Sequence, residues 1–291
     1  MEDIALQFVS GLLKAMFLFL LASGLSLIFG VSRILNIMHG AFYALGAYLV
    51  FAASRAAPLG LGTFTFAVII AGVFVGLCGA IFEVFILRRV YPAGMLFVAL
   101  VTFGGLLLIE KGIKIVWSSD LVTVARPPEL SGAIDFGNNR LPIYNLTLLG
   151  IGAAIALSLW LVIERTRFGL IVRAAAIDRE MLSALGVNVP RVYTLTFALG
   201  TCLAAIAGAL AAPMVSLSPS MGTLMIIETF AVVVIGGLGS LPGSLLGALI
   251  VGELEAFGII VLPEIALPLI YLVMAIILIV RPTGLLGIPR N

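Results

Sequence analysis

A succession of long apolar stretches constrains the fold of this chain more than any other feature of its sequence. About 20 predominantly apolar residues make a helix long enough to cross the roughly 30 Å hydrocarbon core of a bilayer. Of the 291 residues, 62% are hydrophobic and 10% are charged, whereas soluble domains average about 25% charged residues. We therefore predict an all-α, polytopic transmembrane bundle in a single domain, residues 1–291, with about eight spans. The expected spans are 8–31, 34–53, 63–87, 93–115, 143–163, 192–216, 225–260 and 264–280.

Glycine-rich sequence is expected to interrupt the seventh of these stretches. Residues 225–260 are too long for a single crossing, and the run GGLGSLPG at 236–243 falls in their middle. Irregular backbone at membrane depth is tolerated only where it is buried in protein or lines a cavity. We therefore predict two helices or a re-entrant hairpin there. The stretch 34–53, which contains Gly40 and Gly46, is expected to be similarly short or broken.

The basic residues predict the orientation, because short cytoplasmic loops carry an excess of Lys and Arg. The topology that satisfies them best has the N-terminus outside and the C-terminus in the cytoplasm. The acidic start Met1-Glu2-Asp3 lacks the positive charge of a cleavable signal, so the first span is expected to be retained. In this topology 117–142 is an external loop, either a solvated connector or a docking surface, and 164–191 is a cytoplasmic loop.

The cytoplasmic loop carries a helical pattern over 169–185. An apolar stripe recurs at helical spacing, and the charged residues lie off it. Gly186 suits the left-handed position just past a helix end, and Pro190 prevents an easy continuation. The segment either lies flat on the membrane surface or docks into a groove of another protein. The stripe consists of Leu170, Ala174, Ile177, Met181 and Leu185.

Ionisable residues inside the predicted spans are costly in hydrocarbon unless they face a cavity or a partner. We expect the Lys14 ammonium to extend outward along its own side chain, and Glu83 to pair with Arg88. Glu228 either faces a cavity or lies at the outer membrane surface. His39, the only histidine, either satisfies its ring within the bundle or lines a path through it.

Three groups of residues together resemble the branched-chain amino acid permeases of ABC importers. The first is Asn36, His39 and Gly40 with the ending Gly46-Ala47-Tyr48, preceded by Gly24, Phe29 and Gly30. The second is Arg173-Ala174-Ala175 followed by Gly186 and Pro190, which resembles the coupling loop of such permeases, with Arg173 where many families have Glu. The third is Ile235 through Gly243. The three groups occur in the expected order along the chain, and Asn36 and His39-Gly40 favour the LivH type over the LivM type.

This resemblance implies the membrane permease subunit of an ATP-driven importer in the bacterial inner (plasma) membrane. Its substrates would be leucine, isoleucine and valine, delivered by an external solute-binding protein. Its partners would be a second, LivM-type permease and two cytoplasmic ATPase subunits. The expected coupling residues are Arg173, Ala174, Ala175, Gly186 and Pro190. The expected translocation path comprises Asn36, His39, Gly40, Glu228, Gly236, Gly237 and Gly239.

Missing motifs limit the other functions. The sequence has no Gly-x-x-x-x-Gly-Lys-Ser/Thr, so any ATP is expected to be bound by partner subunits, with no cofactor on this chain. One histidine and two separated cysteines do not make a convincing metal site, and no constellation of an enzyme or of nucleic-acid binding is readable. Alternatives within the class are a permease for urea, short amides or other amino acids. A competing class is a stand-alone secondary transporter or channel with Glu228 as its ion-sensitive group.

Overall fold

The computed structural model describes residues 2–136, 139–261 and 263–287. Within these residues the chain is an all-α bundle with one small hairpin. Six of the described helical stretches are long and apolar enough to cross a membrane, and two apolar helices, Met221–Gly236 and Pro268–Val280, are shorter. The helices are α1 Glu2–Ser32, α2 His39–Ala56, α3 Leu61–Phe82, α4 Arg88–Val90, α5 Met95–Trp117, α6 Ile143–Arg165, α7 Arg167–Ile177, α8 Arg179–Ala184, α9 Val189–Ala211, α10 Met221–Gly236, α11 Leu241–Val261 and α12 Ala266–Val280.

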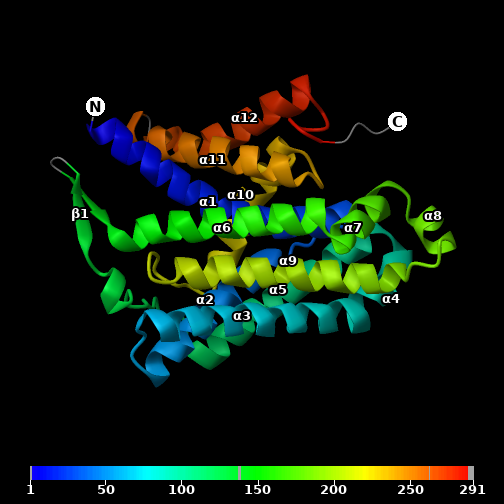
Figure 1. Ribbon diagram of the computed structural model, residues 1–291, viewed down its shortest axis with the longest axis horizontal. Helices are drawn as coiled ribbons and strands as arrows, with labels where there is room; N and C mark the ends of the chain where they lie inside the picture. Colours follow the sequence, from blue (N-terminus) through cyan, green and yellow to red (C-terminus); the bar gives the residue numbers. More distant parts are fainter. Residues whose placement is uncertain (1, 137–138, 262, 288–291) are drawn as a thin grey trace.

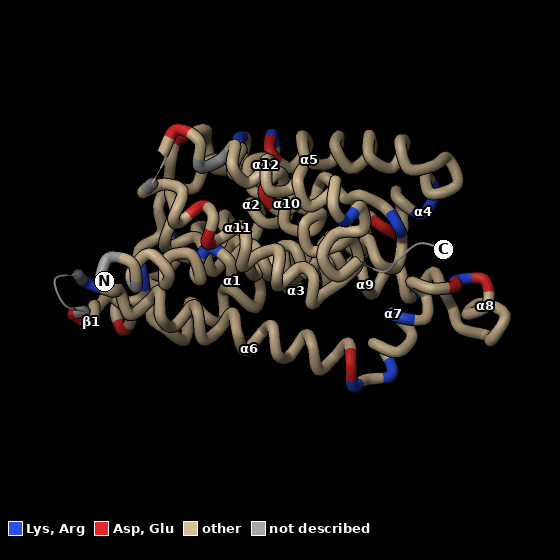
Figure 2. The backbone as a smooth tube through the Cα atoms, turned by 90° about the horizontal axis from the view of Figure 1, so that it is seen from above, with Lys and Arg blue, Asp and Glu red and all other residues tan. Residues whose placement is uncertain are grey.

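The bundle has two distinct ends. The start of α1 and the hairpin lie at one end, and α7 and α8 project from the other (Figure 1). Most of the charged residues gather toward these two ends, and the helical lengths between them carry few (Figure 2). An uncharged band between two charged ends is what a bilayer requires of a spanning bundle.

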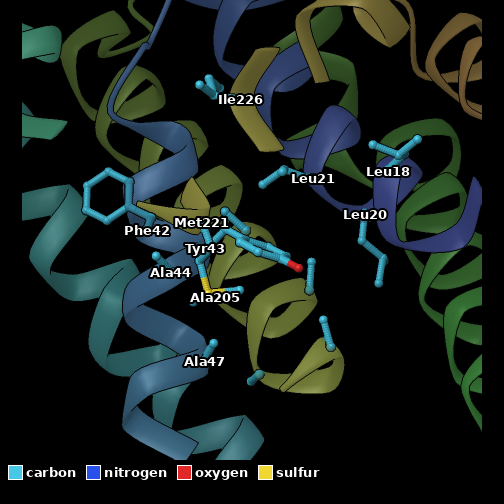
Figure 3. Packing of buried hydrophobic residues seen from close by; sticks show 14 of the residues in the cluster. Leu18, Leu20, Leu21, Phe42, Tyr43, Ala44, Ala47, Ala205, Met221 and Ile226 are labelled. Atoms are coloured by element: carbon cyan, nitrogen blue, oxygen red, sulfur yellow. The ribbon is translucent and has the colours of Figure 1, made fainter. Parts of the chain in front are cut away.

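Three helices, α1, α2 and α9, form the centre of the bundle. Small residues allow their backbones to approach closely, as is usual in membrane helix packing. A side chain at Gly24 of α1 would meet the backbone of Gly200 in α9, and one at Gly46 of α2 would meet the backbone of Ala205. In Figure 3, Tyr43 and Ala47 of α2 lie against α9, with Met221 of α10 beside them. Both Tyr43 and Ala47 are buried.

The predicted interruption within 225–260 is confirmed. Helix α10 ends at Gly236 and α11 begins at Leu241. Gly237 and Gly239 have φ values of 107° and 84°, which favour glycine. The two helices touch directly, because a side chain at Gly236 would meet the carbonyl of Gly243. The chain after α12 covers the break: the amide of Leu286 donates to the carbonyl of Gly236 at 2.9 Å.

The predicted external loop 117–142 contains a hairpin that the sequence did not indicate. Strands β1 (Ala133–Phe136) and β2 (Asn139–Pro142) pair antiparallel. Before the hairpin, the carboxylate of Glu129 accepts a hydrogen bond from the backbone amide of Leu61 at 3.0 Å, at the first residue of α3. The loop is thereby tied to the bundle, as the N-terminus of a helix favours a carboxylate.

Candidate functional site

The structure places Asn36, His39 and Gly40 where the chain re-enters the bundle after α1. Both polar side chains are fully buried. Nε2 of His39 lies 3.0 Å from the carbonyl oxygen of Leu21, so this nitrogen carries the proton and donates it. One ring nitrogen of His39 thus has a partner within the bundle, whereas Nδ1 has none among the described residues. Neither side-chain atom of Asn36 has a hydrogen-bond partner among the described residues.

An unpartnered amide at this depth is unusual. A buried polar group without a partner costs about 1–3 kcal/mol, and native structures contain few of them. Residues 33–38 run without helical structure between Ser32 and His39. Of this segment, the amide of Ile37 is held by the hydroxyl of Thr102 in α5 at 3.3 Å. Irregular backbone within a membrane bundle is tolerated where it is buried in protein or lines a cavity, and Asn36 is buried.

One of the predicted coupling residues and the glycine break meet at a cavity. This cavity of about 230 Å³ separates α1, α6 and α7 from the start of α11. Arg173 of α7 and Gly239 of the break both line it, together with Gly30 of α1. A side chain at Gly239 would meet the Cα of Gly30 at 3.1 Å. The segment 164–191 and the break are therefore neighbours in space.

Arg173 holds α7 against the end of α6. Its guanidinium donates to the carbonyl of Ile163 and pairs with the carboxylate of Glu164 at 3.1 Å. Ala175 on the same helix is buried, and Ala174 is half-buried. Arg173, Ala174 and Ala175, which the resemblance indicated, thus hold α7 against the bundle. Other residues of the segment face outward.

The prediction of one continuous helix over 169–185 is wrong. The segment forms two helices, α7 and α8, separated at Asp178. Asp178 has an extended backbone, and its carboxylate accepts from the amides of Glu180 and Met181 at 3.0 Å each. An aspartate at this position caps a new helix, which competes with continuation of the first. Gly186 has φ 84° after α8, as predicted, and Pro190 lies in the first turn of α9.

The apolar stripe of this segment is uncovered. Leu170, Ile177, Met181 and Leu185 expose 61%, 75%, 63% and 75% of their surface. The residues that bury α7 and α8 against the bundle are others: Gly169, Val172, Ala175 and Leu182. Large apolar side chains exposed on neighbouring helices are typical of a surface that contacts lipid or another protein.

The outward extension predicted for Lys14 is wrong. Its ammonium points into the bundle and pairs with the carboxylates of Glu228 in α10, at 2.7 Å, and Glu255 in α11, at 3.0 Å. Glu228 is therefore a partly enclosed, paired carboxylate with 13% of its side chain exposed. Glu255 had no predicted role. No local sequence pattern joins three residues from three helices, so the cluster appears only in the folded chain.

The predicted pair of Glu83 and Arg88 is confirmed, and it is part of a larger network. The Glu83 carboxylate is fully buried in a π-helical turn, Glu83–Leu87, after α3. It pairs with Arg88 at 2.9 Å and accepts from the hydroxyl of Thr194 in α9 at 2.7 Å. Arg88 also donates to the carbonyl of Pro190 at 3.2 Å. The network ties Pro190, near the end of the segment 164–191, to the turn that follows α3.

Removing this cation is expected to destabilise the fold moderately. Arg88→Gln should lower the free energy of unfolding by about 1–3 kcal/mol, because a buried carboxylate loses its charged partner. This loss of stability is smaller than for a buried carboxylate with no partner at all, since Thr194 still donates to Glu83. Thermal melting of the detergent-solubilised protein measures it. Arg89→Gln, at the exposed neighbouring position, is the control, and equal melting of the two variants would show that the network contributes nothing.

Comparison with known proteins places the chain in a family. The family model described as branched-chain amino acid transport system / permease component matches residues 7–280. The chain is 30% identical over 304 residues to the high-affinity branched-chain amino acid transport system permease protein BraD of Pseudomonas aeruginosa, covering 98% of this chain and 96% of BraD. It is 30% identical over 284 residues to LivH of Escherichia coli K12, covering 93% and 91% of the two chains.

A shorter match reaches a permease for another solute. The fructose import permease protein FrcC of Rhizobium meliloti is 42% identical over 101 residues, which cover 32% of this chain and 28% of FrcC. The full-length matches are the permeases named for branched-chain amino acids. Because the family model spans nearly the whole sequence, the chain belongs to the family of branched-chain amino acid transport system permease components.

Proposed function

We propose that this chain is the membrane permease subunit of an ATP-driven importer, and that the importer carries leucine, isoleucine and valine delivered by an external solute-binding protein. The match of the family model over residues 7–280 carries the proposal. The relatives aligned over nearly their full length are permeases named for branched-chain amino acids, and by this proposal the chain is no enzyme. The apolar helices agree with a multi-pass protein of the bacterial inner membrane.

The proposed assembly contains a second, LivM-type permease and two cytoplasmic ATPase subunits, which bind the ATP. The chain has about eight crossings in this proposal, with the N-terminus outside and the C-terminus in the cytoplasm. The arginines around α7 and α8 support this orientation, because cytoplasmic loops are enriched in basic residues. The hairpin of the loop 117–142 then faces outward, at the side from which the binding protein delivers its solute.

The exposed stripe of Leu170, Ile177, Met181 and Leu185 is the proposed contact with an ATPase subunit. Closure of the ATPases would displace α7, and Arg173 lines the same cavity as Gly239 of the glycine break. Displacement of α7 would therefore reach the junction of α10 and α11 directly. A second contact runs through Pro190, whose carbonyl binds Arg88 after α3. Movement of the segment 164–191 would therefore be transmitted to the bundle both near Arg173 and at Pro190.

The proposed translocation path uses Asn36, His39 and Gly40 together with Glu228, Gly236, Gly237 and Gly239. The unpartnered amide of Asn36 supports it, since a solute or water would give that amide a partner when the path opens. The two glycines with positive φ allow the break to bend without steric strain. A zwitterion needs neutral polar groups and backbone dipoles, which broken helices supply.

ATP-driven movement of radiolabelled leucine across the membrane of proteoliposomes tests the function. The proteoliposomes contain the permeases and the ATPases in an inverted orientation, with the binding protein and labelled leucine in the lumen and ATP outside. The label should leave the lumen only when ATP is hydrolysed. Excess isoleucine or valine should compete, and urea or short amides should not. Movement of leucine by this chain without ATPases would contradict the proposal and favour a stand-alone transporter or channel.

A further inference from the structure

A second cavity lies at the end of the bundle that carries the hairpin. Its volume is about 250 Å³, and it is lined by residues of α1, α2, α6, the end of α9 with the segment that follows, and α10. Small-molecule sites in proteins measure about 300–1,000 Å³ when the ligand is drug-sized, so this space suits a smaller solute. The lining residues are Ser10, Leu13, Lys14, Phe17, Leu18, Tyr43, Asn145, Ala211, Met214, Val215 and Met225.

The charges at this cavity are unbalanced. Lys14 lines the cavity, and its ammonium is held between Glu228 and Glu255 at 2.7 and 3.0 Å. Two carboxylates share one ammonium, so the cluster has one negative charge in excess when all three groups are ionised. A buried charge without a counter-charge is costly. The two carboxylates are not among the residues that line the cavity, so Lys14 is the charged group that its wall presents.

Two further polar groups lie in the cavity wall. Asn145 of α6 presents a side-chain oxygen that is buried and has no hydrogen-bond partner among the described residues. Tyr43 of α2 also lines the cavity, and Figure 3 shows its ring projecting from α2 toward α1. The remaining wall is apolar, with Phe17, Leu18 and Met225 among its residues. The cavity thus offers one acceptor in need of a donor, one ammonium group and an apolar surface.

We propose that this cavity receives a zwitterionic amino acid with an aliphatic side chain, ahead of the path at Asn36 and His39. The α-ammonium of the solute donates to the side-chain oxygen of Asn145. Its α-carboxylate takes a hydrogen bond from Lys14 or the Tyr43 hydroxyl, and its alkyl group packs on the apolar wall. This assignment rests on the proposed function, because it names where the imported solute is held.

The chemistry also accounts for the pairing of Lys14 in the empty cavity. With no solute present, the two glutamates neutralise the ammonium and keep it from being stranded in the bundle. An arriving zwitterion carries one charge of each sign, so it leaves the net charge of the cluster unchanged. A lone carboxylic acid or a lone amine changes that balance and is expected to bind more weakly.

Protection of an introduced cysteine tests the site in the complete transporter. Cys78 and Cys202 are first replaced by serine, and Val215, which lines the cavity and exposes 41% of its surface, is replaced by cysteine. Leucine in excess should slow modification of this cysteine by a small methanethiosulfonate reagent at least about fivefold. Isoamylamine and 4-methylpentanoate, which each lack one charged group, should slow it much less. Thr63→Cys, exposed at the start of α3, is the control that leucine should leave unchanged.

A matched pair of variants provides the second measurement. Asn145→Leu should reduce leucine protection at position 215 and lower ATP-driven leucine transport about tenfold, with little change in melting temperature. Thr147→Val lies on the same helix, outside this cavity, and should retain both. A purely structural role of Asn145 would instead lower the melting temperature and leave the protection intact.

The outcomes separate this site from the function on which it rests. The wild-type complex could transport leucine with ATP while leucine fails to protect the cysteine at position 215 and Asn145→Leu transports normally. In that case the site is wrong and the function stands. If the wild-type complex carries no leucine, the proposed function itself fails. Equal slowing by the uncharged alkane hexane would mean that the cavity is a general apolar pocket, such as one for a lipid chain, and would overturn the assignment.

Discussion

Gly40→Ala is expected to lower the melting temperature of the detergent-solubilised protein by about 10 °C, or to prevent folding. Helices α2 and α10 touch backbone to backbone at this point. A Cβ at Gly40 would overlap the carbonyl oxygen of Gly222, and one at Gly222 would overlap the carbonyl of Gly40. A flexible side chain could turn aside, but a backbone carbonyl moves only with its helix. The two helices would have to separate, and the contacts around them would be lost.

Two further variants make this prediction specific. Gly222→Ala should melt as early as Gly40→Ala, because it fills the same contact from the other side. Gly104→Ala, on α5, is the control: nothing lies within 4 Å of a Cβ there, and alanine is the better helix former. If Gly40→Ala and Gly104→Ala melt at the same temperature, the close approach of α2 and α10 does not hold the bundle together.

The sequence predicted those features whose cause is local. Gly236, Gly237 and Gly239 interrupt an apolar stretch within a few residues of one another, so the break between α10 and α11 was readable from their spacing. Gly186 was readable for the same reason, since a glycine after an amphipathic run commonly ends a helix in the left-handed conformation. The pairing of Glu83 with Arg88 needed only the separation of one helical turn or so.

Features that depend on distant partners were not predictable. Lys14, Glu228 and Glu255 come from three helices, and propensity says nothing about which helices adjoin. The outward extension assigned to Lys14 assumed lipid around it, whereas α10 and α11 supply two carboxylates. The division at Asp178 had a local signal that the apolar periodicity concealed: an aspartate is a strong N-cap, and its carboxylate starts α8. The cavity at Asn145 likewise exists only through the packing of several elements.

Placing charges on the exposed stripe is expected to abolish assembly with the ATPase subunits. The double variant Met181→Asp, Leu185→Asp should weaken that association by at least about 30-fold, because each aspartate would be buried at an apolar interface without a partner. Stability should change little, since the two native side chains expose 63% and 75% of their surface in the permease. Co-purification of the ATPases and ATP-driven leucine transport are the two measurements.

Ser183→Asp is the matched control for that variant. It adds one aspartate, half the charge of the double variant, at an exposed position between the two and off the stripe, and should retain the ATPases. Leu182→Asp differs from both, because Leu182 is buried against the bundle and its replacement should lower the melting temperature. This contrast separates loss of docking from loss of folding.

The alternative location of the stripe, flat on the membrane surface, makes the opposite prediction. Lipid headgroups would then cover Met181 and Leu185, and the double variant would still bind the ATPases. A cysteine at Met181, in a chain whose two native cysteines are replaced, distinguishes the arrangements directly. Docking in the cytoplasm requires that a membrane-impermeant maleimide label this cysteine in inside-out vesicles and not in intact cells, and that bound ATPase block the labelling. Labelling from outside would reverse the proposed orientation and remove the stripe from any contact with the ATPases.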